Sequence, residues 1–204
     1  MRWIICCILV LAAGALPAEP FLLLGGSAGF VSQNDEAMNP WSAVSLGVAE
    51  QSYVDLTPTF GLYSAAALGF VIRSRDNGIV LNVGQYQTMS LNVLLGVGYR
   101  MTFEKLTGVA GAGIYFGSTM LTAGNYSLSS IDAGGAGVGI GASLMYSPMF
   151  TWGIGANVNA AYYLTIPGNA APTMASSGVS IFGGFGVVFF FGSRADARPG
   201  ITRF

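Results

Sequence analysis

Histidine is absent from this 204-residue chain, and cysteine occurs only as Cys6 and Cys7. Both cysteines lie in residues 1–18, which have the layout of a secretory signal peptide: a lone Arg2, an apolar run and then small residues. Cleavage after Ala15 or Ala18 would leave a chain with neither residue type. Such a chain has no thiol chemistry, no disulfide and none of the common zinc sites. We therefore expect no cofactor and no bound metal.

Charge is scarce as well. Charged residues make up 8% of the chain, and the mean hydropathy is +0.59. Such a chain has little to offer a water-facing surface, so a membrane or a large apolar partner is expected. The formal net charge is −1 and there is no basic patch, which excludes nucleic acid as a partner. Isolated carboxylates near turns, such as Asp76, Glu104 and Asp132, do not indicate an enzyme.

No apolar run reaches the roughly 20 residues that a membrane-spanning helix needs. Alternation is present instead. The polar face of residues 150–165 is small and carries Asn157 and Asn159, and the opposite face reads Phe150, Trp152, Ile154, Ala156, Val158, Ala160, Tyr162, Leu164. A period of two is typical of a strand. An apolar face opposite a small polar face suits a strand between lipid and a lumen.

Similar alternation predicts eight strands, at residues 21–31, 60–73, 79–87, 89–103, 107–117, 133–146, 150–165 and 179–193. Residues 32–58 are interpreted as one long connection, although residues 42–49 could form a further strand. Asp76-Asn77-Gly78 indicates a hairpin turn. Short connections at 75–78, 104–106 and 147–149 would lie at one end, with long ones at 32–58, 118–130 and 166–177 at the other.

These patterns predict an all-β fold, a transmembrane antiparallel up-and-down β-barrel of about eight strands. It would span residues 19–193, between a signal peptide at 1–18 and a polar tail at 194–204. One alternative is a helical membrane protein, because Val179 to Phe191 is apolar and rich in glycine. Another is a water-soluble lipocalin-like barrel, whose exterior would need charges that these strands lack.

By its strand pattern the chain resembles the small eight-stranded outer-membrane barrels of Gram-negative-type bacteria, the OmpA-domain, OmpX and OmpW group. The resemblance covers essentially the whole mature chain and includes no specific motif. It implies residence in the outer membrane, contact with its lipid and recognition by the outer-membrane assembly machinery. In those families a terminal aromatic residue is read during assembly. The candidates here are Phe189 to Phe191, or Phe204 after an eleven-residue tail.

Three sets of side chains are predicted to face the lumen. The outer constriction, near the long loops, consists of Tyr63, Tyr86, Tyr115 and Tyr163. The polar middle consists of Asn82, Asn92, Asn157 and Asn159. The inner mouth, at the short turns, consists of Arg73 and Arg100. In one interpretation the tyrosines plug the barrel and the arginines pair with Glu104 or Asp76, because an eight-stranded interior is only just wide enough for its own side chains. In another, the many lumen glycines leave a cavity. In a third, they let a curved sheet close.

We therefore expect a monomeric outer-membrane barrel that forms a narrow channel or binding lumen for small hydrophobic or weakly polar molecules. Passage of small hydrophobic compounds is what the resemblance to OmpW-type barrels implies. The rival hypothesis is an adhesin or host-factor-binding protein, in which the barrel only anchors residues 32–58 and 118–130. Exposed loops on a rigid scaffold often carry recognition. A purely structural role is a third possibility.

Overall fold

The computed structural model describes residues 20–34, 40–57, 59–76, 79–81, 86–123, 132–149, 151–165 and 177–191. The predicted signal peptide and C-terminal tail lie outside these residues. In the described part of the chain, no helix is long and apolar enough to cross a membrane.

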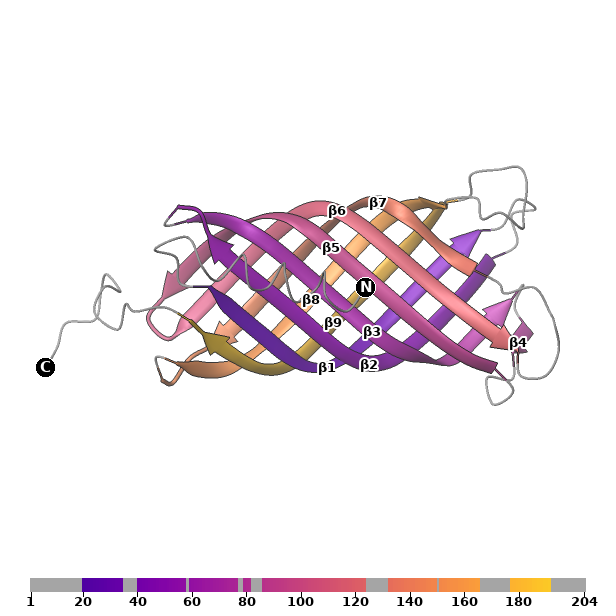
Figure 1. Cartoon of the computed structure of the whole chain (residues 1–204), viewed down its shortest axis with the longest axis horizontal. Helices are drawn as coiled ribbons and strands as arrows, with labels where there is room; N and C mark the ends of the chain where they lie inside the picture. The colour runs from indigo at the N-terminus through magenta and orange to yellow at the C-terminus, as the bar shows by residue number, and fades with distance from the viewer. Residues whose placement is uncertain are drawn as a thin grey trace, which may run out of the picture.

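The structure is a closed eight-stranded antiparallel barrel, as the alternation predicts. Its wall follows the order β2-β1-β9-β8-β7-β6-β5-β3, and a further pairing of β2 with β3 closes it. Figure 1 shows the strands inclined to the long axis, as closure requires. The wall strands are β1 (Phe21–Asn34), β2 (Pro40–Asp55), β3 (Phe60–Asp76), β5 (Tyr86–Phe103), β6 (Leu106–Ala123), β7 (Asp132–Tyr146), β8 (Trp152–Thr165) and β9 (Ser177–Phe190).

Two strand predictions are wrong. One wall strand is missed and one is counted twice, so the predicted total of eight is still correct. Residues 32–58 are not one long connection, because β2 occupies Pro40–Asp55 and pairs along its length with β1 and β3. Residues 79–87 and 89–103 are not successive wall strands. The short β4 (Ile79–Leu81) and β5 both pair with β3, and β5 continues across the expected break at Gln87-Thr88.

The missing strand also reverses the direction expected for β3. Residues 56–59, 104–105 and 147–151 connect strands at one end of the barrel, which we call the short-turn end. At the opposite, loop end lie the connections 35–39, 124–131 and 166–176, together with β4. The connection at 75–78 therefore lies at the loop end and not with the other short turns.

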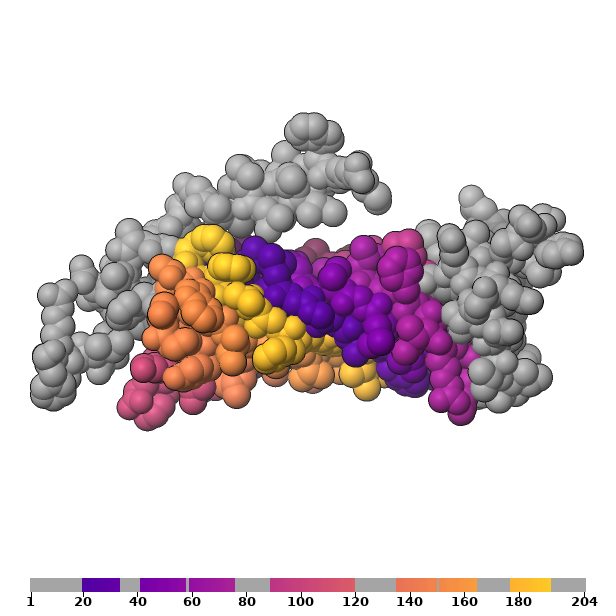
Figure 2. Space-filling model, turned by 90° about the horizontal axis from the view of Figure 1, so that it is seen from below, coloured from indigo at the N-terminus to yellow at the C-terminus, as the bar shows by residue number. Residues whose placement is uncertain are grey.

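The outer wall is apolar, with aromatic residues gathered toward both ends and mainly aliphatic residues between them, where Phe185 is an aromatic exception. Figure 2 shows the side chains of β9, β1 and β2 following one another diagonally around the barrel. Exposed aromatic residues near the short-turn end are Phe60, Tyr99, Phe103, Tyr146, Trp152 and Phe189, and those toward the loop end are Phe30, Phe70, Phe116 and Tyr162. Two aromatic girdles around an apolar band are typical of a transmembrane barrel.

Glu50 interrupts this outer band on β2, two residues beyond the exposed Val48. Ser52 is two residues farther along the same outward face of β2. The Ser52 hydroxyl lies 2.6 Å from that of Ser64 on β3. Together these side chains form a small polar cluster across the seam between β2 and β3.

The turn between β5 and β6 is strained at one residue. Phe103 pairs with Leu106, so Glu104 and Lys105 are the two central residues, and Glu104 has a φ of 49°. A positive φ at the first central residue alone corresponds to a type II′ turn, which favours glycine at that position.

We expect Glu104→Gly to raise the free energy of unfolding by about 0.5–1 kcal/mol, because glycine removes the cost of the left-handed conformation. Equilibrium urea unfolding in lipid vesicles measures the change. Lys105→Gly is the matched control and should lower stability, since Lys105 has no positive φ. A loss of stability in Glu104→Gly equal to that of the control would contradict the turn assignment.

Candidate functional site

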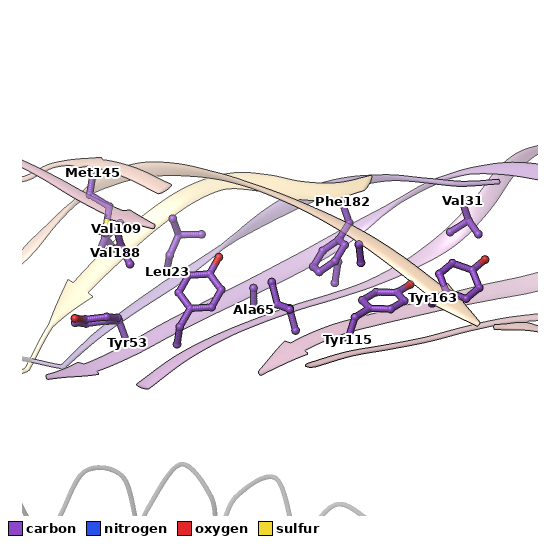
Figure 3. Packing of buried hydrophobic residues seen from close by; sticks show 14 of the residues in the cluster. Leu23, Val31, Tyr53, Ala65, Val109, Tyr115, Met145, Tyr163, Phe182 and Val188 are labelled. Carbon is purple, nitrogen blue, oxygen red and sulfur yellow. The ribbon is translucent and has the colours of Figure 1, made fainter. Parts of the chain in front are cut away.

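The lumen is the candidate functional site, and tyrosine rings occupy it along its length. Tyr53, Tyr63, Tyr115 and Tyr163 are among the largest fully buried side chains. Figure 3 shows Tyr53, Tyr115 and Tyr163 spaced along the barrel, with Leu23 and Phe182 between or beside them. These side chains point inward because they occupy alternate positions of strands whose other face meets lipid.

Tyr63 is tied to the opposite side of the barrel. Its hydroxyl donates to Asn159 Oδ1 at 2.6 Å, which joins β3 to β8. Asn159 Nδ2 in turn donates to the carbonyl oxygen of Phe182 on β9, at 3.4 Å. The amide therefore uses both of its ends to hold the tyrosine across the lumen.

Asn92 is the centre of a second network, toward the loop end. Its Oδ1 accepts hydrogen bonds from the Tyr115 hydroxyl at 2.6 Å and from the Ser180 hydroxyl at 2.8 Å. The Tyr115 ring lies 5.5 Å from the Tyr163 ring and 6.2 Å from the Phe182 ring, centroid to centroid. Three strands, β5, β6 and β9, meet at one buried amide oxygen.

Further hydrogen bonds connect other strands. Gln51 Nε2 on β2 donates to the Ser143 hydroxyl on β7 at 2.9 Å. The Tyr163 hydroxyl on β8 donates to Gln33 Oε1 on β1 at 3.3 Å. Together with the Tyr63 and Asn92 networks, they connect strands from all around the barrel through its interior.

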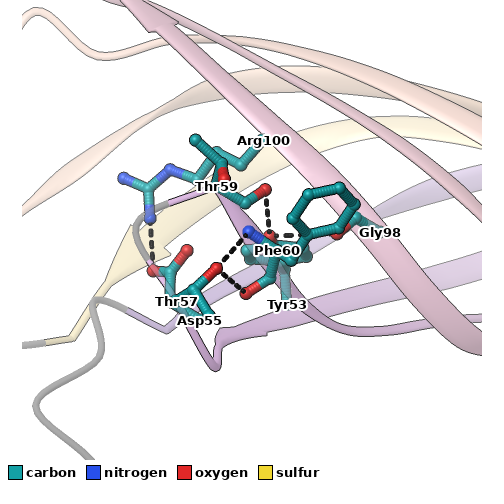
Figure 4. Close-up of polar contacts among 7 residues, drawn as sticks. All are labelled: Tyr53, Asp55, Thr57, Thr59, Phe60, Gly98 and Arg100. Atoms are coloured by element: carbon teal, nitrogen blue, oxygen red, sulfur yellow. Dashed lines mark hydrogen bonds and ion pairs between the residues drawn. The ribbon is translucent and has the colours of Figure 1, made fainter.

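An ion pair lies at the short-turn end of the lumen. Arg100 Nη1 contacts Asp55 Oδ2 at 2.6 Å, with side chains only 8% and 12% exposed. Beside it, the Tyr53 hydroxyl lies 3.3 Å from the carbonyl oxygens of Thr59 and Gly98 (Figure 4). The expected pairing of this arginine with Glu104 or Asp76 is replaced by one with Asp55, which lies at the end of β2 and not in a long connection.

The lumen glycines make room for these rings and for close strand contacts. A Cβ at Gly111 would approach the Tyr63 ring, one at Gly117 the Tyr115 hydroxyl, and one at Gly178 the Tyr163 ring. At the facing pair Gly96 and Gly113, a Cβ on either residue would meet a carbonyl oxygen of the other strand. The geometry therefore favours plugging and tight closure over a glycine-lined cavity.

The predicted lumen residues fall into three groups. Inward and buried are Tyr63, Tyr115, Tyr163, Asn92, Asn157, Asn159 and Arg100. Tyr63 lies toward the short-turn end and not near the loops, because β3 runs opposite to the expected direction. Tyr86 begins β5 at the loop end, where its side chain is outside the described part of the structure, as is all of Asn82.

Arg73 is exposed on the outer wall, so its prediction as a lumen residue is wrong. The cause is a β-bulge: Val44 pairs with Arg73 and Ser45 with Val71, which leaves Ile72 as an extra residue of β3. An extra residue reverses the inward and outward faces of the strand after it.

Sequence reasoning missed Gln51, Tyr53 and Asp55 because it treated β2 as a connection. The usable signal was the alternation of Val44, Leu46 and Val48 just before them, which indicates a strand that these residues continue. Among the described residues no group of three or more Asp, Glu, His or Cys side chains could hold a metal ion.

The sequence matches no protein-family model and no curated protein. The structure is similar to that of the outer-membrane protein OprG from Pseudomonas aeruginosa, with a TM-score of 0.56, 11% identity, and coverage of 86% of this chain and 97% of OprG. Outer membrane protein AlkL, determined in lipid bilayers, matches with a TM-score of 0.53 and 13% identity over 91% of this chain and 96% of AlkL. Neisserial surface protein A matches with a TM-score of 0.52 and 11% identity over 84% of this chain and 97% of that protein. The chain therefore shares the fold of small eight-stranded outer-membrane barrels.

We expect Asn92→Leu to lower the free energy of unfolding by about 2–4 kcal/mol, because the Tyr115 and Ser180 hydroxyls would be buried without their acceptor. The triple variant Asn92→Leu, Tyr115→Phe, Ser180→Ala removes both orphaned hydroxyls and should recover part of that loss. Urea unfolding in vesicles measures both. A triple variant less stable than the single one would contradict this network.

We expect Arg100→Gln to cost about 3 kcal/mol of unfolding free energy, since it leaves the Asp55 carboxylate buried without its cation. The double variant Arg100→Gln, Asp55→Asn should lose much less unfolding free energy than the sum of the losses in the two single variants. A double-mutant cycle of the four proteins measures the coupling. Strict additivity would show that the ion pair contributes nothing at the short-turn end.

Proposed function

We propose that this protein is a bacterial outer-membrane β-barrel with a sealed lumen, which acts as a rigid anchor for the connections at its loop end. The apolar band between two aromatic girdles supports a membrane location. The fold shared with OprG, AlkL and Neisserial surface protein A supports the outer membrane in particular. Export by a cleaved signal peptide, insertion by the assembly machinery and a monomeric state belong to the same proposal.

The observation that carries the sealed lumen is the set of buried tyrosines held by hydrogen bonds at successive levels. Tyr63 is fixed by Asn159 in one half of the barrel and Tyr115 by Asn92 in the other. The Arg100–Asp55 pair lies beyond them at the short-turn end. An interior only just wide enough for its own side chains leaves little room for a solute once these rings are in place.

The narrow channel for small hydrophobic or weakly polar molecules is the weaker candidate. Passage would require Tyr115 and Tyr163 to leave their positions, which breaks their hydrogen bonds to Asn92 and Gln33 and the contact between their rings. Most of the glycines that suggested a cavity are already covered by tyrosine rings, by aliphatic side chains or by neighbouring backbone. These observations favour the anchor.

The anchor role follows from where the two longest connections lie. Residues 124–131 and 166–176 both join strands at the loop end, as do the fewer residues 35–39, and a braced barrel gives them a fixed base. Segments that rest on a rigid scaffold often carry recognition. Closure by β2 and β3 also leaves no free strand edge in the wall that could pair with another copy.

We expect no solute passage through the wild-type barrel, because the rings fill its interior. Liposome swelling with small neutral solutes and single-channel recording both measure it. The variant Tyr115→Ala, Tyr163→Ala should admit solutes, since two contacting rings are removed from the loop half. The control Tyr162→Ala changes an outward tyrosine, 53% exposed, and should stay closed.

Steady conductance or swelling with the wild type would overturn the sealed barrel in favour of the channel. A double variant as tight as the wild type would show that these two rings are not the barrier. A heated and unheated gel comparison of each protein verifies that the barrel has folded.

A further inference from the structure

The bulge in β3 moves two arginines from the lumen to the outer wall. Val71 is buried, Ile72 and Arg73 are both exposed, Ser74 is buried again and Arg75 is exposed. An uninterrupted strand would turn Arg73 and Arg75 inward and Ser74 outward, because successive side chains alternate. One extra residue therefore places both guanidinium groups outside the barrel.

These arginines lie just beyond the apolar band, at the loop end. Phe70, in the aromatic girdle there, is 64% exposed, and Ile72 is 54% exposed. At about 3.3 Å per strand residue, Arg73 and Arg75 are about 10 and 16 Å farther along the strand than Phe70. Because barrel strands are inclined by roughly 40° to the barrel axis, these lengths give about 8 and 12 Å of height. That height carries the chain from the aromatic girdle into the headgroup layer, where long cationic side chains are favoured.

Among the described side chains, no carboxylate occupies either guanidinium group. Opposite them on β2 stand Val44, facing Arg73, and Ser42, facing Arg75, neither of which carries a charge. The other cations of the described barrel are elsewhere, since Arg100 is in the lumen and Lys105 is at the short-turn end.

We propose that Arg73 and Arg75 form a binding site on the outer wall of β3 for the phosphate groups of lipids in the leaflet at the loop end. The site rests on the proposed membrane location of the barrel. Guanidinium forks bind phosphate oxygens in pairs, and two forks on one strand face can hold a single headgroup. Phe70 and Ile72 lie below them, where they would contact the acyl chains of the same lipid.

Native mass spectrometry of the barrel released from nanodiscs tests this site. The discs contain phosphatidylcholine with a minor fraction of either phosphatidic acid or diacylglycerol, which differ only in the phosphate. We expect the wild type to retain phosphatidic acid in preference to diacylglycerol. Arg73→Gln, Arg75→Gln should bind phosphatidic acid about 10- to 30-fold more weakly, at about a factor of five for each surface cation.

Two further variants separate charge from geometry and position. Arg73→Lys, Arg75→Lys keeps both charges without the planar fork and should bind with intermediate strength. Lys105→Gln removes an exposed cation at the opposite end and should bind like the wild type. Equal retention of phosphatidic acid by the double glutamine variant and the wild type would overturn the proposal, as would equal retention of the two lipids by the wild type.

Inorganic phosphate is the third arm of the experiment. Displacement of phosphatidic acid by millimolar phosphate would identify a soluble-anion site and overturn the lipid site. Failure of the proposed membrane location gives a different result. In that case every variant, Lys105→Gln included, would lack heat-modifiable migration and would not enter the nanodiscs at all.

Discussion

Closure of eight strands around a narrow interior is the constraint on which the rest of this structure depends. An interior of that width holds little beyond its own side chains, so each large ring needs small residues on the strands that face it. Tyr63 meets this condition over Gly111 and Gly141, and Tyr163 over Gly178. Part of the glycine content of the wall is thus a consequence of the rings it encloses, and the rest lets neighbouring strands approach closely.

Closure also separates the lumen from bulk water, which makes each buried polar group dependent on a partner. A buried hydroxyl or amide without a hydrogen bond costs more than a satisfied one gains. Asn92 and Asn159 meet that need, because one amide group can serve two partners on different strands. The asparagines on the inward faces therefore act as braces across the barrel.

The fold class could be predicted from the sequence because a period of two is a local property of each strand. Register and direction are not local, and there the prediction failed. Inward polar side chains such as Gln51 and Ser45 are acceptable in β2, so its weak hydrophobic contrast resembled a loop. With β2 missing, β3 was assigned the wrong direction, and Tyr63 was placed at the wrong end even though its inward face was predicted correctly. The inward orientation of Asn92, Asn157 and Asn159 can be predicted without knowing the register between strands. The partner of Arg100 cannot, because it depends on which residue of a neighbouring strand lies beside the arginine.

Bulges are the other feature that alternation cannot reveal, and here the bulge decides where charge lies. Alternation alone assigns Arg73 to the lumen, whereas the pairing of Val44 with Arg73 and of Ser45 with Val71 puts it outside. The same seam between β2 and β3 carries Glu50 with Ser52 and Ser64. Among the described side chains, the charged exceptions to the apolar outer wall, Glu50, Arg73 and Arg75, therefore all lie on β2 and β3. Because the lumen is filled by its own rings, chemistry on the wall at this seam has direct access to surrounding molecules, while the interior does not.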